Sequence, residues 1–426
     1  MKPDERGLPE CGLGTSDNGK RLFIFSSVHG DKSFLFCIFA INITKESMER
    51  LRVEVREVTT RRLMDDFVKL PNKLYINCPQ YVPLPMTVEL QDFAPERNPS
   101  LAECEVKLFT AYAEGRCVGR VAGIINNRAN SKWKTKAVRF SRIEFTDTPE
   151  VSAALLKAVE DWGRSLGMDE IYGPLGFNDF DKEGMLLTDF DRVGSMNEIY
   201  NPPYYPQHLE ALGYEKAADW VHVRVKVPDA VPERYARLAE LSRSRYGLKV
   251  KKINNNDITE KGYGRRIFNL LNQSYSPLFG FIEFTDSEIE LFVKEYIRLI
   301  DKELITVVEN QAGEIVGVAI TMGSITRALQ RARGKLWPTG WLWLLRSLLV
   351  KHEDTVEMLL IAVRPDYQLK GVNALFFDDL IPIYIRYGFK WAETGPQLVD
   401  NTRELRQWDT LSPELIKRRR CWKKSL

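Results

Sequence analysis

The chain has 426 residues, which is too long for one ordinary hydrophobic core, so two domains are expected. Hydrophobic residues make up 44% of it and charged residues 28%, which excludes wholesale disorder. With 61 basic and 58 acidic residues the formal charge is only +3, which argues against nucleic acid as a general partner. The six cysteines form no Cys-x-x-Cys pair and the four histidines are scattered, so we expect reduced thiols in the cytosol and no metal site.

Residues 1–47 are expected to be a poorly ordered leader. Their most apolar stretch, residues 33–43, is shorter than the ~18 residues that a membrane-spanning helix needs. No small-residue cleavage site follows that stretch, which disfavours the alternative of an unusually late signal peptide. Regular alternation of apolar and polar residues begins only after Met48.

Residues 48–230 are expected to form a first α/β domain. Pro149 and Gly167 mark the two ends of its longest helix, because proline suits a first helical turn and glycine a helix stop. Alternation and helical spacing predict, in chain order, a strand over 52–58, a helix over 59–75, a hairpin over 103–125, a strand over 137–145, a helix over 149–167, a strand over 169–174 and a last helix and strand over 202–225.

Residues 231–426 repeat that order, which predicts a second α/β domain. A fused internal duplication is the simplest account, with a junction near residues 227–246. The expected elements are a strand over 247–253, helices over 265–275 and 286–300, a hairpin over 303–322, a strand over 355–365, a helix over 372–388 and a strand over 389–394.

A glycine turn joins the strand and helix of the second half. After Pro365, the residues Gln368-Leu-Lys-Gly371 open the helix, and a glycine there lets the backbone approach a ligand closely. The free amides of the first helical turn then point at that ligand, which favours a phosphate group. The alternative is an ordinary strand-to-helix turn that happens to contain a glycine.

This turn resembles the acetyl-coenzyme A signature of the GNAT acyltransferases, V-x-P-x-x-[QR]-x-x-G-x-[GA]. Val363, Pro365, Gln368 and Gly371 match it position by position, whereas Asn373 departs from the usual Gly or Ala. The resemblance implies two fused GNAT-like domains, each a mixed twisted sheet flanked by helices, and an acyl-CoA co-substrate without a metal. The residues that it implies for the cofactor are Val363, Gln368, Leu369, Lys370, Gly371, Val372, Asn373 and Ala374.

In the first half, the equivalent turn contains Thr146-Asp147-Thr148-Pro149 in place of the glycine, and Asp147 and Glu150 would repel phosphates. We therefore expect the first half to have lost cofactor binding and to serve the acceptor. Residues 173–213 resemble uncharacterised bacterial tandem GNAT proteins, some of whose relatives are regarded as bacterial ceramide synthases. That resemblance implies that the acceptor is an amine, and one candidate is a lipidic amine similar to a sphingoid base.

Acyl transfer from a thioester to an amine needs a group that takes the amine proton. Glu357 lies eleven residues before Gln368, the offset of the catalytic glutamate in the histone acetyltransferase branch of GNAT enzymes. Period two would place Glu357 on one face with Leu359, Ile361 and Val363, and those apolar neighbours would raise its pKa. The alternative for Glu357 is a solvent-facing strand glutamate near the end of the sheet, and Glu393 on the next strand is the second candidate for the base.

Polar residues in the first half are candidate acceptor contacts, although such residues beside Gly and Pro also cap loops. They are Glu144, Asn178, Asp181, Asn201, Tyr204 and Tyr205.

The segment from Ala328 to Lys351 interrupts the second half with basic residues at both ends of a core rich in tryptophan and leucine. This pattern favours an anionic membrane surface, which would make the protein cytoplasmic and peripheral on the inner face of the membrane. An amphipathic helix packed on the core, or a dimer contact, is the alternative. Two other functions stay open: an aminoacyl-tRNA-dependent transferase of the peptidoglycan type, and an inactive acyl-CoA sensor or scaffold.

Overall fold

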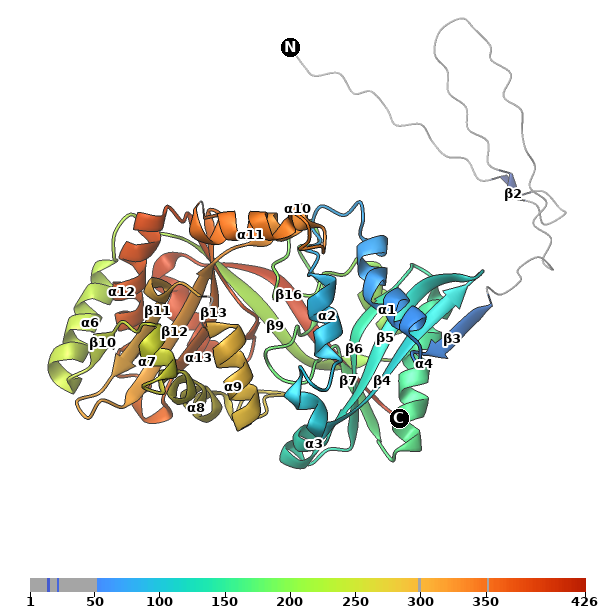
Figure 1. Ribbon diagram of the computed structural model, residues 1–426, viewed down its shortest axis with the longest axis horizontal. Helices are drawn as coiled ribbons and strands as arrows, with labels where there is room; N and C mark the ends of the chain where they lie inside the picture. The colour runs from blue at the N-terminus through green and yellow to red at the C-terminus, as the bar shows by residue number, and fades with distance from the viewer. Residues whose placement is uncertain (1–13, 16–20, 23–51, 298–299, 351) are drawn as a thin grey trace, which may run out of the picture. The chain divides into compact units, whose positions relative to one another are not determined.

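The computed structural model describes residues 14–15, 21–22, 52–297, 300–350 and 352–426. Apart from two short paired strands, β1 (Gly14–Thr15) and β2 (Arg21–Leu22), the expected leader lies outside the described residues. Residues Val53–Leu426 form one compact unit (Figure 1). Within the described part of the chain, no helix is long and apolar enough to cross a membrane.

The first half forms its elements largely where the residue pattern places them. Thr60 caps the helix over Arg61–Leu74 by accepting the amide of Leu63 at 3.3 Å. Pro149 occupies the first turn of the helix over Pro149–Ser165. The elements are β3 (Val53–Glu57), α1 (Arg61–Leu74), α2 (Met86–Asp92), β4 (Cys104–Ala113), β5 (Arg116–Asn126), α3 (Asn127–Trp133), β6 (Ala137–Phe145), α4 (Pro149–Ser165), β7 (Glu170–Gly173), β8 (Met185–Leu186), α5 (Tyr204–Ala211) and β9 (Glu215–Lys226).

The second half follows the same order with extra helices. Thr285 and Glu288 form a capping box, in which each side chain accepts the other residue's backbone amide. The elements are α6 (Glu233–Tyr246), β10 (Lys249–Lys251), α7 (Asn255–Thr259), α8 (Tyr263–Tyr275), α9 (Asp286–Glu295), β11 (Ile305–Glu309), β12 (Ile315–Gly323), α10 (Thr326–Ala332), α11 (Gly340–Leu349), β13 (Thr355–Val363), α12 (Val372–Tyr387), β14 (Trp391–Thr394), β15 (Gln397–Leu398), α13 (Thr402–Leu405) and β16 (Glu414–Ser425).

One sheet runs through both halves of the unit. Among the described residues its strand order is β10-β11-β12-β13-β14-β9-β16-β7-β6-β5-β4-β3, with β15 and β8 attached to β9 and β16. The two halves exchange their last strands: β9 of the first half pairs with β14, and β16 of the second half pairs with β7. The mixed, helix-flanked fold is confirmed, whereas the division at residues 230 and 231 stays a prediction, since the sheet crosses it.

Helices cover both faces of the second-half sheet (Figure 1). Alternate residues of β11 separate the two cores: Val308 packs under α6 and α12, and Val307 packs under α8 and α9. This alternation is the period-two geometry of a strand that is buried on both sides. The sheet of the second half, which carries Glu357 and Glu393, is therefore packed against helices on both faces.

The C-terminal strand was not predicted from the sequence, because its run of lysines and arginines suggests a solvated tail. Trp422 on β16 is nevertheless 1% exposed and packs in the hydrophobic core of the first half. Its Cα pairs with that of Gly173 on β7. The first half therefore completes its core with a residue from the end of the chain.

Trp422→Ala is expected to lower the free energy of unfolding by about 3–5 kcal/mol, because it leaves a large cavity in a closed core. Hydrogen exchange should speed up first in β6 and β7, far from Trp422 in sequence, and less in β11 and β12. Equal acceleration in all four strands, or none, would contradict an exchanged strand that serves the first half.

Candidate active site

Strands β13 and β14 run parallel for four residue pairs and then part. The paired residues end at Met358 and Thr394, so the outer edge of β13 beyond Met358 has no strand beside it. Glu357 lies directly opposite Glu393 in this short ladder. The two candidate bases predicted from the sequence are therefore neighbours at the point where the sheet opens.

The strict alternation expected from Glu357 to Val363 is wrong, because a β-bulge interrupts it. Ile320 pairs with Leu360 and Thr321 with Met358, so Leu359 has no partner on β12. Leu359 packs in the core under α8 and α9, whereas Ile361 and Val363 pack in the core under α12. Glu357 does not share a face with Ile361 and Val363, since the extra residue reverses the alternation.

Burial of the Glu357 side chain raises the pKa of its carboxyl group to about 7. The residue is 7% exposed, and its carboxylate accepts a bond from the Asn197 amide at 3.4 Å and one from the Ser324 hydroxyl. No cation is paired with it among the described residues. A carboxyl group in this environment exchanges a proton near neutral pH, as a general base requires.

Glu393 belongs to a network of buried charges beside Glu357. Its carboxylate lies 3.1 Å from Arg224 Nε and 3.5 Å from Lys417 Nζ. Lys417 also contacts Glu198 at 3.1 Å, and Arg419 contacts the other oxygen of Glu198 at 3.0 Å. Burial alone would raise the pKa of Glu198, but these two cations hold it well below its usual range.

His222 completes the network as a neutral side chain. The Arg419 guanidinium donates to its Nε2 at 3.0 Å, so its proton lies on Nδ1, which donates to the carbonyl of Thr394 at 2.9 Å. Burial lowers the pKa of His222 to about 3. This histidine therefore fixes the end of β14 and is not arranged to carry protons at neutral pH.

Sequence reasoning missed five members of this network: Glu198, His222, Arg224, Lys417 and Arg419. Glu198 lies in a loop of the first half, and Lys417 and Arg419 lie on the unpredicted β16. No local pattern marks them, because they meet only after the two last strands have been exchanged.

The glycine turn has the expected conformation. Gly371 caps the N-terminus of α12 with φ of 75°, which favours glycine, and Leu369 beside it has φ of 66° and is exposed. A Cβ atom on Gly371 would come within 2.2 Å of Ser242 Oγ on α6. Helix packing thus requires this glycine independently of any ligand.

The remaining residues predicted for the cofactor divide into two groups. Val372 and Ala374 are buried under the turn, while Asn373 donates to the Gln407 side chain at 2.7 Å. Gln368 is exposed and accepts from Arg403 at 3.4 Å, whereas Lys370 is half-buried with its ammonium 4.3 Å from the centre of the Tyr367 ring. The Lys370 cation and the start of α12 suit an anionic ligand.

Helix α8 occupies the open edge of β13. The Tyr275 hydroxyl donates to the carbonyl of Ile361 at 2.8 Å and accepts its amide at 3.3 Å. Ser274 donates to the carbonyl of Val363 at 3.1 Å. An extended ligand that pairs with this edge would have to replace both hydroxyl groups.

A tyrosine cluster surrounds the buried carboxylate of Glu144 in the first half. Tyr75 and Tyr205 both donate to Glu144, and their hydroxyl groups lie 2.9 Å apart. Burial raises the pKa of Glu144 to about 7. Tyr204 donates to the carbonyl of Phe145 at 2.7 Å and lines an adjacent cavity of about 430 Å³. The structure thus brings three predicted acceptor residues, Glu144, Tyr204 and Tyr205, into one cluster.

The other three predicted acceptor residues have structural bonds. Asn178 donates to Ser100 and Glu288, Asp181 accepts the amide of Phe177 and pairs with Arg142, and Asn201 binds the backbone of Leu186. These contacts match the loop-capping alternative.

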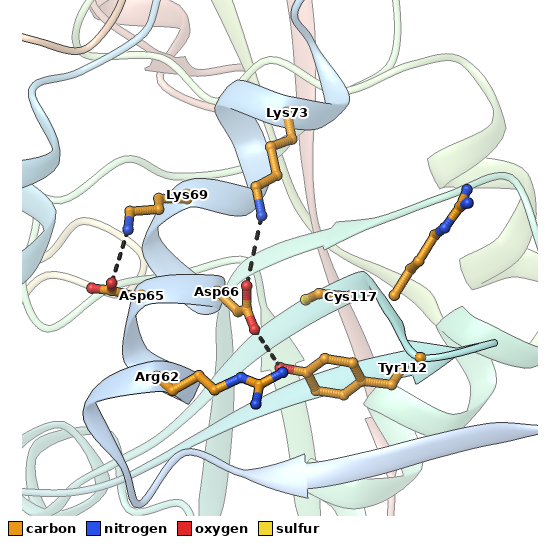
Figure 2. Close-up of a pocket in the computed structure, with 9 residues that line it drawn as sticks. Arg62, Asp65, Asp66, Lys69, Lys73, Tyr112 and Cys117 are labelled. Carbon is orange, nitrogen blue, oxygen red and sulfur yellow. Dashed lines mark hydrogen bonds and ion pairs between the residues drawn. The ribbon is translucent and has the colours of Figure 1, made fainter.

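A second cavity, of about 560 Å³, lies between α1 and the β4–β5 hairpin, and Figure 2 shows its lining. None of the predicted site residues lines it. Its two carboxylates are already paired, Asp65 with Lys69 at 2.8 Å and Asp66 with the Tyr112 hydroxyl at 2.9 Å. Elsewhere too, the described residues contain no group of three or more His, Cys, Asp or Glu that could hold a metal ion.

No family model matches the chain, but two curated proteins are similar to it in sequence. Protein YghO of Escherichia coli K12 is 25% identical over 377 residues, which cover 87% of this chain and 95% of that protein. The bacterial ceramide synthase of Caulobacter vibrioides is 28% identical over 329 residues, which cover 74% of this chain and 82% of that protein.

Solved structures with this fold include a tandem GNAT protein from the clavulanic acid biosynthesis pathway, with a TM-score of 0.52 at 12% identity. The match covers 88% of this chain and 98% of that one. A GCN5-related glucosamine N-acetyltransferase region of a fungal multi-domain β-N-acetylglucosaminidase gives a TM-score of 0.54 at 12% identity, over 88% of this chain and 38% of that one. At such identities the likeness shows the fold alone.

Lys417→Ala is expected to lower the free energy of unfolding by about 3 kcal/mol or more, because it removes a cation from the buried Glu198 carboxylate. Urea unfolding measures the change. Lys157→Ala is the matched control: its pair with Asp161 is exposed, and its loss should change stability by less than about 0.5 kcal/mol. A similarly small loss of unfolding free energy in both variants would show that the ion pair with Arg419 is enough to balance the charge of Glu198.

Proposed function

We propose, from the tandem GNAT fold of this chain, that it is an acyl-CoA-dependent N-acyltransferase that acts on an amine. The observation that carries the proposal is the placement of Glu357. Its buried carboxyl group, with a pKa near neutrality, lies at the point where β13 and β14 part. The same β13 leads directly into the glycine turn of α12.

Residues of the turn suit the donor. The first-turn amides of α12 and the Lys370 ammonium would hold the pyrophosphate of acyl-CoA. Its extended pantetheine arm would pair with the edge of β13 in place of the Ser274 and Tyr275 hydroxyl groups. The observed φ of 75° at Gly371 supports this assignment, because the signature turn needs a glycine that adopts this conformation at the start of α12. The donor half of the proposal uses residues of the second half of the chain.

The transfer itself needs one proton acceptor and no covalent enzyme intermediate. Glu357 takes the proton that the amine loses, the amine nitrogen bonds to the thioester carbonyl carbon, and the carbon–sulfur bond breaks. The departing sulfur leaves as a thiolate and is protonated to the free thiol. Asn197 and Ser324 hold the Glu357 carboxylate in place during this exchange.

Two observations support an acceptor site built with the first half. The loop that carries Asn197 and Glu198 comes from that half and reaches Glu357. Burial lowers the pKa of Lys182 in the first half to about 8, and the carboxylates of Glu89, Glu198 and Glu144 oppose that shift. The ceramide synthase name of the Caulobacter relative favours a lipidic amine as the acceptor.

Glu357→Gln is expected to lower the turnover rate by about 100-fold or more at pH 7 with little change in donor affinity, the usual effect of losing a general base. Glu393→Gln is the comparison, since it changes the neighbouring carboxylate on β14. Turnover is measured with a thiol reagent that detects released coenzyme A. A rate within about threefold of the wild type for Glu357→Gln, with a large loss for Glu393→Gln, would reverse the assignment.

Thermal unfolding separates this catalytic role from a structural one. The pKa of Glu357 is raised in the folded state, so the stability that its neutral form contributes is present at low pH and is lost as the pH rises toward about 7. Glu357→Gln keeps the side chain neutral and should therefore be at least as stable as the wild type at pH 8. A large drop in Tm at pH 8 would show that the glutamate is structural.

Tyr275→Phe is expected to tighten acyl-CoA binding by about fivefold, because the tyrosine hydroxyl competes for the edge of β13 and its removal frees one hydrogen-bonded position. Calorimetric titration with acyl-CoA measures the change. Lys370→Glu should weaken binding by about tenfold, and Lys249→Glu, on the exposed strand β10, is its control. Weaker binding to Tyr275→Phe would contradict donor binding along this edge.

A further inference from the structure

Helices α10 and α11 and the residues around them, which we call the α10–α11 arm (residues 326–350), lie along one rim of the second half (Figure 1). Seven of the eighteen exposed large hydrophobic side chains of the described residues are in this arm. Trp337 is 80% exposed, Leu349 75% and Val350 76%. The others are Trp341, Leu342, Trp343 and Leu345.

The two helices of the arm differ: α10 buries Ala328, Leu329 and Ala332, whereas α11 leaves most of its apolar side chains uncovered. Within α11 only Gly340 and Ser347 are buried, so the helix meets the protein through its two smallest residues. Leu344 and Leu348 are partly covered, and the remaining apolar side chains face outward. The alternative of an ordinary amphipathic helix packed on the core fits α10, but it does not fit α11, whose larger apolar side chains are half-buried or exposed.

All charges in the arm are positive. Between Ser324 and His352 the sequence has no aspartate or glutamate. Arg331, Arg333, Lys335 and Arg346 are exposed around the apolar patch. The Arg331 guanidinium lies 5.1 Å from the centre of the Trp343 ring, which joins the basic and the aromatic parts of the surface. Lys351, which belonged to the predicted segment, lies outside the described residues.

This combination favours an anionic lipid surface over a second copy of the chain. In a twofold dimer, the same basic residues would approach one another and repel. Lipid phosphates and carboxylates would instead attract each arginine and lysine, while tryptophan favours the headgroup boundary. The surface is too short to span the bilayer and has the composition of a helix that lies on it.

The arm is attached to the candidate active site on its inner side. Ser347 donates to the carbonyl of Ser324, whose own hydroxyl group bonds to Glu357. At its other end, Gln330 donates to the carbonyls of Pro79 and Tyr81 in the first half. A surface bound by the arm would therefore lie next to both the proposed base and the proposed acceptor half.

We infer that the α10–α11 arm docks the protein on anionic membranes, and that the acceptor amine is a long-chain amphiphile taken from that surface. The inference about the acceptor rests on the proposed function, whereas the inference about membrane docking does not. Salt should weaken docking only in part, because the tryptophans and leucines contribute a share that ions do not screen.

Sedimentation of the full chain with vesicles tests the docking. The protein should sediment with phosphatidylcholine vesicles that contain about 30% phosphatidylglycerol, and much less with phosphatidylcholine alone. Trp341→Glu with Trp343→Glu should reduce binding by about tenfold or more without a change in Tm. Leu166→Glu with Ile385→Glu is the matched control, since the four side chains are 40–42% exposed, and it should bind as the wild type does.

Three results would overturn the docking inference. The wild type could stay in the supernatant, the control pair could lose as much binding as the tryptophan pair, or light scattering could show a dimer that the tryptophan variant dissociates.

Turnover of two amines tests the acceptor. The variant with Trp341→Glu and Trp343→Glu should keep its turnover of a short soluble amine and lose turnover of a long-chain amine presented in vesicles. Equal turnover of the long-chain amine by this variant and the wild type would overturn the inference that the acceptor is taken from the membrane surface. If Glu357→Gln were fully active while docking persisted, only the proposed function would fail.

Discussion

The pairing of β9 with β16 is the contact on which the rest of the structure depends. These two last strands are exchanged between the halves, so β9 extends the second half and β16 completes the first. Without the other half, each half therefore lacks the strand at the inner end of its sheet. Trp422 packs in a core whose other buried residues all lie between Phe109 and Tyr214. The exchange also brings Lys417 and Arg419 to the loop that carries Glu198.

The position of these two cations explains why the pKa of Glu198 is lowered while that of the nearby Glu357 is raised. Glu198 has two cations at bonding distance, which outweigh its burial and keep it charged. Glu357 is equally buried, but its bonding partners are the neutral groups of Asn197 and Ser324, and Lys417 acts on it without forming an ion pair. Burial therefore outweighs these groups and raises the pKa of Glu357. Carboxyl groups whose surroundings move their pKa values apart are typical of catalytic centres, where one group holds charge and another moves a proton.

Both halves treat the open edge of their central strand in a similar way. In the first half the Tyr205 hydroxyl accepts the amide of Phe145, and its one proton is shared between the Phe145 carbonyl and Glu144. In the second half the Tyr275 hydroxyl accepts the amide of Ile361 and donates to its carbonyl. The two tyrosines come from different helices, α5 and α8, so the common need of an unpaired strand edge, and not the duplication alone, accounts for them. Such hydroxyl bonds satisfy the edge without closing it permanently.

The sequence by itself determined the α/β elements, their repetition and the glycine turn, because alternation, helical spacing and backbone freedom at Gly371 are local properties. It also placed Glu357 and Glu393 on neighbouring strands. Only the tertiary structure decided the bulge at Leu359, the burial of Lys417 and Arg419, and the outward direction of Trp341 and Trp343. These features depend on which strand pairs with which and which helix face meets the sheet, and contacts between residues far apart in the chain leave no periodic pattern in either segment.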